Sequence, residues 1–110
     1  MSKDTEVCCP KYQKAAEVLT RRWTPQIIRM LLSGHQYFSE LRTSIPGLSD
    51  RLLSERLKEL EGEGIVNRQV YPETPVRIEY RLTQRGKDMG EIVLAIQRWA
   101  DKWEEAPVNV

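Results

Sequence analysis

The segment SDRLLSERLKELEGEGIV, residues 49–66, contains the strongest structural signal in this chain. Leu53, Leu57 and Leu60 recur at i, i+4 and i+7, the spacing of an apolar stripe along one side of an α-helix. Ser49 precedes the stripe as an N-cap, because its hydroxyl can accept a hydrogen bond from a free backbone N–H of the first turn. The side opposite the leucines is polar: Arg51, Ser54, Glu55 and Lys58. The helix therefore presents one face to a core and another face to something outside it.

Shorter helices are predicted upstream. Thr24 followed by Pro25 is a start signal, a cap residue before a proline at the first helical position. Ser39 is the expected cap of the next helix, and Pro46 with Gly47 forms the tight turn before the long one. The helix that begins at Thr24 is so densely apolar that we expect it to be largely buried. The upstream helices span residues 12–19, 24–33 and 39–45.

Downstream of the long helix, the periodicity changes from helical to extended. Gly62 and Gly64 end the helix, and residues 76–82 then alternate strictly between apolar and charged side chains. This alternation predicts a half-buried strand with Glu79 on its polar face. Residues 65–71 are the expected partner strand, so the two segments form a hairpin.

A long helix follows the hairpin. Thr83 is its expected cap, and apolar residues then continue at helical spacing for about four turns. Two of these residues are tryptophans, a type that is enriched at protein interfaces. The alternative is that the tryptophans cover the open edge of their own domain. We expect four side chains of this helix to form a homodimer interface: Ile92, Ile96, Trp99 and Trp103.

The order of these elements is that of a winged helix-turn-helix, a mainly α fold with a small β-hairpin. A chain of 110 residues is too short for two ordinary domains, so we expect a single domain over residues 1–110. Cys8 and Cys9 lie in its expected flexible N-terminal segment. The flexible segment, the helix-turn-helix, the wing hairpin and the dimerisation helix correspond to residues 1–10, 39–61, 65–82 and 83–104.

A helix-turn-helix binds double-stranded DNA by placing the N-terminal part of its second helix in the major groove. Arg51 is then suited to a guanine or a phosphate, Ser54 to a base or a phosphate, and Lys58 to the backbone. Glu55 has two interpretations, acceptance from a cytosine amino group or an ion pair with Arg51 one turn earlier, and we favour the ion pair. Arg77, beside the hairpin tip, is suited to a phosphate or to the minor groove.

Composition and charge limit the classes of function. The chain is 40% hydrophobic and 30% charged, as in soluble globular proteins, and no apolar run approaches the roughly 18 to 20 residues that span a bilayer. The expected setting is the cytoplasm, because the N-terminus lacks an apolar segment of signal-peptide length. The net charge of +1 conceals a basic stretch at residues 67–87, which is suited to phosphates, and an acidic stretch at residues 88–110.

Several motifs resemble the HxlR-type bacterial transcriptional regulators, which are MarR-like, when taken in their order and spacing. These motifs are Cys9-Pro10, Trp23, YFSELRTSIPGL at residues 37–48 with the helix and hairpin that follow, and RWADKW at residues 98–103. Arg21-Arg22 departs from the family, in which glycine-lysine is more usual before the tryptophan. The resemblance implies a dimeric DNA-binding regulator, here expected to be a repressor, whose terminal helices form the dimer and whose operator is nearly palindromic. It also implies a set of DNA contacts: Ser49, Arg51, Ser54, Lys58 and Arg77.

Some members of this family sense electrophiles, quinones, aldehydes or oxidants through the cysteine that precedes the N-terminal proline. Cys9 holds that position, and Cys8 is an addition that leaves open which thiol reacts. A disulfide between adjacent cysteines is strained, so we expect two reduced thiols at rest. The alternative is a pair of inert thiols at a flexible end, because thiol reactivity depends on cationic neighbours that sequence does not place.

Other classes of function fit the residues less well. A nucleophilic pair of Cys9 and His35 lacks an orienting third group, so we expect no enzyme activity. Two adjacent thiols and one histidine lack the spacing of a zinc site, and the sequence has no glycine-rich phosphate loop, so we expect neither metal nor cofactor. The alternative is a winged helix that binds only protein, whose contact helix would carry apolar anchors instead of Arg51, Ser54 and Lys58.

Overall fold

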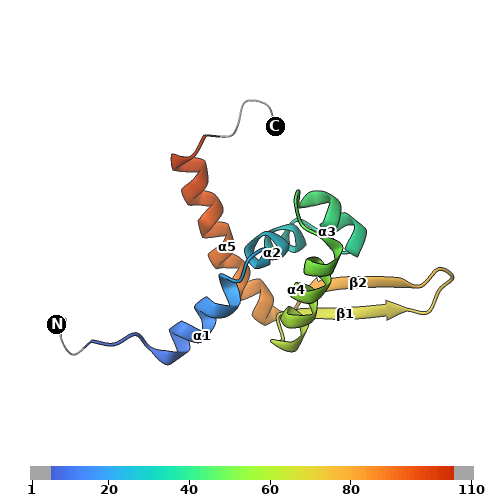
Figure 1. Cartoon of the computed structure of the whole chain (residues 1–110), viewed down its shortest axis with the longest axis horizontal. Helices are drawn as coiled ribbons and strands as arrows, with labels where there is room; N and C mark the ends of the chain where they lie inside the picture. Colours follow the sequence, from blue (N-terminus) through green and yellow to red (C-terminus); the bar gives the residue numbers. More distant parts are fainter. Residues whose placement is uncertain (1–5, 106–110) are drawn as a thin grey trace.

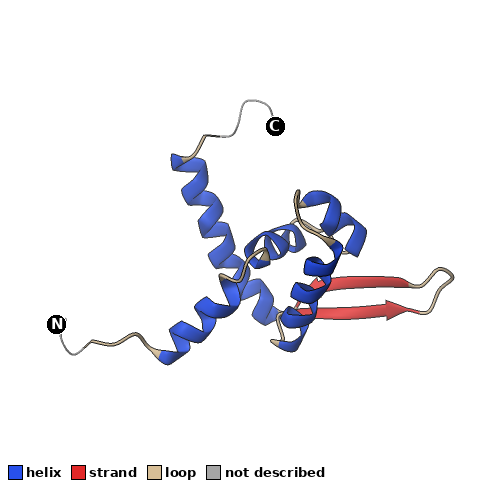
Figure 2. Ribbon diagram, in the orientation of Figure 1, coloured by secondary structure: helices blue, strands red, loops and turns tan. Residues whose placement is uncertain are grey.

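The computed structural model describes residues 6–105, in which five helices and one antiparallel hairpin form a mainly α fold (Figure 1). Residues 1–5 of the expected flexible segment lie outside the described residues. The hairpin projects to one side of the helices (Figure 2). None of the described helices is long and apolar enough to cross a membrane. In chain order the elements are α1 (Pro10–Leu19), α2 (Thr24–Leu32), α3 (Phe38–Ser44), α4 (Asp50–Gly62), β1 (Val66–Tyr71), β2 (Arg77–Leu82) and α5 (Gln84–Trp103).

The core forms where α2, α3, α4 and the base of the hairpin meet. Ile27 of α2 and Leu41 of α3 are fully buried, and they belong to one apolar cluster with the leucines of α4. Leu53, Leu57 and Leu60 are at most 2% exposed, which confirms the predicted apolar stripe. The opposite side of α4 is therefore left facing outward.

Two predicted helix caps are confirmed. The Ser49 hydroxyl accepts a hydrogen bond from the backbone N–H of Leu52 at 3.1 Å, at the start of α4. The Thr83 hydroxyl accepts from the backbone N–H of Gly86 at 3.1 Å and donates to the carbonyl of Gly64 at 2.6 Å. Thr83 thus begins α5 and also ties this helix to the loop before β1.

Gly86 lies where α5 approaches that loop closely. A Cβ atom at this position would be 2.1 Å from the backbone carbonyl oxygen of Ile65. Because Gly86→Ala must displace backbone, we expect it to lower the free energy of unfolding by about 1 to 3 kcal/mol in urea titrations. Gly62→Ala is the matched control, since a Cβ there has no neighbour within 4 Å and stability should stay equal or rise. Equal stability of the two variants would contradict this close approach.

Two other predicted caps are wrong. Thr24 is the first helical residue of α2 and not its cap. The α3 helix begins at Phe38, before the expected cap Ser39. The Glu40 carboxylate accepts from the backbone N–H of Tyr37, the N-cap residue, at 3.1 Å, so an acidic side chain in the first turn stabilises the start of α3.

The turn between α1 and α2 is anchored to α4. Trp23 takes the cap position before α2 with a φ of 77°, in the left-handed region. Arg56 of α4 donates from Nε to the carbonyl oxygen of Arg22 at 2.8 Å, and Arg21 forms an ion pair with Glu59 of α4 at 3.0 Å. The Arg21 side chain and the Arg22 backbone carbonyl thus hold the turn against α4.

The hairpin is regular, with Tyr71 opposite Arg77 at its outer end. The predicted polar face of β2 is wrong at Glu79, which is only 4% exposed. The Tyr37 hydroxyl donates to the Glu79 carboxylate at 3.4 Å, and Arg81 forms an ion pair with the same carboxylate. Tyr37 also pairs with Glu79 through the backbone, so the segment before α3 covers this part of β2.

Candidate nucleic-acid interface

The turn between α3 and α4 positions the polar helix. Ile45 and Leu48 are buried, and Gly47 between them has a φ of +87°, which favours glycine. Arg42 of α3 forms an ion pair with Asp50 at the start of α4. A role for Arg42 could not be predicted from the sequence, because an ion pair that spans the turn depends on the angle between the two helices. Arg42 is exposed beside the N-terminus of α4 and extends its polar surface.

The predicted DNA contacts of α4 share its exposed face. Arg51, Ser54 and Lys58 lie at i, i+3 and i+7, so they form one row along the helix. The Arg51 side chain is 89% exposed, and its Nε lies 3.2 Å from the Glu55 carboxylate. This distance confirms the ion-pair interpretation of Glu55. Lys58 forms no ion pair within residues 6–105, so its ammonium group is available to an anion.

Ser49 lies at the N-terminal end of α4, next to this row. Its oxygen accepts the capping hydrogen bond from Leu52, and its own hydroxyl hydrogen remains available as a donor. The chemistry of Ser49 therefore allows two tasks at once, capping the helix and donating to a group outside the protein.

The last predicted contact, Arg77, lies on the wing and not on α4. Its guanidinium carbon is 4.3 Å from the centre of the Tyr71 ring, and its Nη2 is 3.4 Å from the Glu73 carboxylate. Both partners keep the guanidinium near the outer end of the hairpin, which projects away from the helices (Figure 1). The ion pair with Glu73 is largely exposed and therefore weak, so a phosphate can compete for Arg77.

A row of large apolar side chains on α5 is exposed. The exposed fractions are 51% for Ile92, 51% for Ile96, 59% for Trp99 and 65% for Trp103. The spacing i, i+4, i+7 and i+11 places all four on one side of the helix. The C-terminal half of α5 extends away from the other helices (Figure 1). The tryptophans therefore do not cover the edge of their own domain, and the alternative interpretation is wrong.

Both cysteines are exposed free thiols, and Cys9 holds the N-cap position of α1. Backbone N–H groups of Tyr12 and then Lys11, in the first turn of α1, lower the pKa of the Cys9 thiol. The thiolate is the nucleophilic form, so this position favours reaction at Cys9. Within residues 6–105, no three histidine, cysteine or acidic residues are grouped closely enough to hold a metal ion.

Comparison with known proteins gives a consistent set of relatives. The sequence model described as HxlR-like helix-turn-helix matches residues 18–107. The HTH-type transcriptional regulator YvaP of Bacillus subtilis strain 168 is 54% identical over 95 residues, which cover 86% of this chain and 88% of YvaP. The HTH-type transcriptional regulator YodB of the same strain is 44% identical over 97 residues, which cover 88% of this chain and 87% of YodB.

Solved structures agree with these matches. The crystal structure of diamide-treated YodB from B. subtilis has a TM-score of 0.74 and 42% identity, and the match covers 92% of this chain and 100% of that one. The redox regulator HypR in its oxidised form has a TM-score of 0.82 and 32% identity, and the match covers 89% of this chain and 100% of HypR. Both similarities extend over most of the fold described above.

Proposed function

The chain belongs to the HxlR-like helix-turn-helix family and is a transcriptional regulator, and we propose that it is a homodimeric repressor whose N-terminal thiols sense electrophiles or oxidants. The observation that carries the DNA-binding part is the exposed row of Arg51, Ser54 and Lys58 on a helix whose opposite face is buried. A helix held in this way can enter a major groove without loss of core contacts.

We assign different tasks to the contact residues. The Nη groups of Arg51 are suited to a guanine edge or a phosphate, because Glu55 occupies only its Nε. Ser49 and Ser54 are suited to phosphates or bases, and Lys58 to the sugar-phosphate backbone. On the wing, Arg77 contacts a phosphate or the minor groove. The contacts to the sugar-phosphate backbone then set the position of the protein on the duplex, and Arg51 sets its preference for a particular base sequence.

This assignment predicts different effects for the two arginines. Arg77→Ala should weaken binding almost equally on all sequences, and the slope of log K against log salt concentration should fall in magnitude by about one unit per lost phosphate contact. Arg51→Ala should relax the preference at one position of each half-site, at a cost of about 1 to 3 kcal/mol. Gel-shift titrations at several salt concentrations measure both effects.

Arg98→Ala is the matched control, since it removes an exposed arginine from α5 and should leave both quantities unchanged. An unchanged salt slope and an unchanged affinity in both Arg51→Ala and Arg77→Ala would rule out the recognition surface proposed here.

The proposed dimer has two-fold symmetry and is formed mainly by α5, with help from α1. Support comes from the exposed stripe of Ile92, Ile96, Trp99 and Trp103, which gives a contact area rich in aromatic side chains. Two-fold symmetry presents two α4 helices to the same face of a duplex. We therefore expect a nearly palindromic operator with half-sites separated by a multiple of about 10 base pairs.

The proposed sensor is Cys9, with Cys8 as a second thiol. Support comes from the exposure of the Cys9 sulfur, from the backbone N–H groups that lower its pKa, and from its position at the start of α1. Related proteins point the same way: YodB is known in a reduced and a diamide-treated form, and HypR is a redox regulator with an oxidised form. Modification at Cys9 would act beside the helices assigned to the dimer.

A further inference from the structure

A carboxylate is buried where the wing leaves the helices. Glu79 of β2 is 4% exposed, and within residues 6–105 it is the only buried residue with a charged side chain. Burial of a charge is costly unless the group is paired and hydrogen-bonded. The Tyr37 hydroxyl donates to Oε2 of this carboxylate at 3.4 Å, and Arg81 forms an ion pair with Oε1. Each carboxylate oxygen therefore has a partner.

Tyr37 connects this carboxylate to the helix-turn-helix. It is the N-cap residue of α3, and its own backbone N–H donates to the Glu40 carboxylate at 3.1 Å. The backbone N–H of Tyr80 donates to the carbonyl oxygen of Gln36 at 2.7 Å, and Tyr37 pairs with Glu79 through the backbone. The start of α3 is therefore bound to β2 by both main-chain and side-chain contacts.

Glu79 is the last buried residue of the wing in the direction of its tip. On β2 the next residue, Ile78, is half-buried and Arg77 is exposed, and β1 has no buried residue after Val66. The outer part of the wing projects away from the helices (Figure 1). A two-stranded hairpin is at best marginally stable alone, so its direction depends on the point at which it is anchored. Arg77 lies two residues beyond that point on the same face of β2, about 7 Å along the strand.

We propose that Glu79 and Tyr37 are positioning residues, which hold the wing at the angle where Arg77 and the row on α4 reach one duplex together. This inference rests on the proposed function, because it requires that both α4 and the wing contact DNA. Two contacts on one rigid unit reinforce each other, whereas a contact on a mobile arm must first be ordered, at a cost in affinity. Glu79 itself is buried and anionic, so it acts through Arg77 and not on a phosphate.

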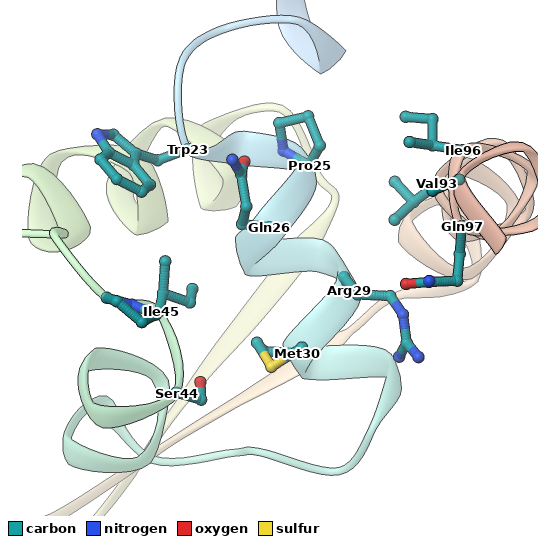
Figure 3. Close-up of a pocket in the computed structure, with 12 residues that line it drawn as sticks. Trp23, Pro25, Gln26, Arg29, Met30, Ser44, Ile45, Val93, Ile96 and Gln97 are labelled. Carbon is teal, nitrogen blue, oxygen red and sulfur yellow. The ribbon is translucent and has the colours of Figure 1, made fainter. Parts of the chain in front are cut away.

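The groove between α2 and α5 is separate from this anchor. It has a volume of about 610 Å³, and its walls include Trp23, Arg29 and Val93 (Figure 3). Of the described residues that line it, none belongs to the wing and none is Tyr37. Substitutions at Tyr37 and Glu79 therefore leave the lining residues of this groove unchanged.

Gel-shift titrations with the duplex that the reduced wild type enriches from genomic DNA test the positioning in two backgrounds. Tyr37→Phe, which removes only the hydroxyl, and Glu79→Ala should each weaken binding at least about fivefold in the wild-type background. In the Arg77→Ala background each should cost less than about twofold, because no wing contact is left to position. Glu79→Gln keeps an acceptor for the Tyr37 hydroxyl and should lose less than Glu79→Ala.

The salt dependence gives a readout that a merely structural role would not change. In Tyr37→Phe and Glu79→Ala, the slope of log K against log salt concentration should fall in magnitude by about one unit, as in Arg77→Ala. The base preference assigned to Arg51 should remain, because α4 keeps its place in the core. A variant that only unfolds more easily would lose active protein and keep the slope of the wild type.

Amide hydrogen exchange measured by NMR without DNA tests the anchor itself. The Tyr80 N–H should exchange at least about tenfold faster in Tyr37→Phe and Glu79→Ala, while the N–H of Leu57 in the middle of α4 keeps its rate. General loss of stability would speed exchange at both amides. Glu91→Ala is the control, since it removes an exposed carboxylate from α5 and should behave like the wild type in every measurement.

Three results would overturn the inference. Unchanged exchange at Tyr80 in both Tyr37→Phe and Glu79→Ala would show that the contact does not hold the wing. Equal losses of affinity in the wild-type and Arg77→Ala backgrounds would show that it does not position Arg77. Both of these results leave the proposed function standing. If Arg77→Ala itself binds like the wild type, the wing contact of the proposed function is wrong, and the positioning role fails with it.

Discussion

Ile96→Glu combined with Trp99→Glu is expected to convert the proposed dimer into monomers at micromolar concentration. Both side chains are more than half exposed in the single chain, and burial of such a side chain contributes about 1.5 to 3 kcal/mol. A glutamate in their place would put an unpaired charge into an apolar interface. The linked gain from two half-site contacts would also disappear, so we expect operator affinity to fall by about 10²- to 10⁴-fold.

Analytical ultracentrifugation and gel-shift titration measure these two effects. The control is Arg98→Glu, which adds the same residue type to α5 away from the stripe and should remain a dimer. A wild type that sediments as a monomer would refute the dimer. A double variant that remains dimeric would assign the interface to another surface.

Modification of Cys9 is expected to reduce operator affinity at least about tenfold. With a quinone, the thiolate adds to a ring carbon, a carbon–sulfur bond forms, and the ring takes up a proton to become the hydroquinone adduct. With diamide, the thiolate adds to an azo nitrogen and the other nitrogen takes up a proton; a second thiol then displaces the reduced hydrazine to form a disulfide, more readily on the other subunit of the proposed dimer than at adjacent Cys8. We expect either product at the start of α1 to change the distance between the two α4 helices of the proposed dimer. If that distance no longer matches the separation of the half-sites, the two helices cannot bind at once and the gain from joint binding is lost.

Operator binding by wild type, Cys8→Ser and Cys9→Ser, before and after 1,4-benzoquinone or diamide, separates the roles of the two thiols. We expect wild type and Cys8→Ser to lose affinity and Cys9→Ser to keep it. Mass spectrometry verifies which sulfur is modified. Full affinity of the wild type with Cys9 modified would show that this thiol is not the switch.

The lowered pKa of Cys9 gives this reaction a pH dependence. Below the ordinary pKa of a thiol, folded Cys9 holds a larger thiolate fraction than the same residue in an unfolded chain, so it should react faster near pH 7. The advantage should shrink as pH rises past the ordinary pKa, because both states are then ionised. It is also partly offset, since a thiolate of lower pKa is a weaker nucleophile. Iodoacetamide alkylation of Cys8→Ser with and without urea measures both rates.

The helices and two of the caps could be predicted from sequence because their signals are local. The spacing alone of Leu53, Leu57 and Leu60 indicates a buried stripe. The hydroxyls of Ser49 and Thr83 each accept a hydrogen bond from a backbone N–H three residues later. Such features need no knowledge of the rest of the chain.

Features that depend on distant contacts could not be predicted in the same way. Glu79 appears exposed from the alternation of its strand, and it is buried because Tyr37, 42 residues earlier, covers it. The left-handed backbone of Trp23 lies in a turn whose neighbours, Arg21 and Arg22, contact residues of α4 more than 30 positions later. The row on α4 was predicted as a set, because a single helix carries it, whereas the contribution of Arg42 required the turn geometry.

Selection of bound sequences from fragmented genomic DNA, run in parallel with a reductant and with a thiol-reactive quinone, examines specific recognition by α4 together with the thiol switch. Under reducing conditions, the wild type should enrich a nearly palindromic site with half-sites separated by a multiple of about 10 base pairs. Arg51→Ala should relax one position of each half-site, and the quinone should abolish the enrichment by wild type but not by Cys9→Ser. Enrichment of no common site by the reduced wild type, or of the same site with equal strength by Arg51→Ala, would contradict recognition through this helix.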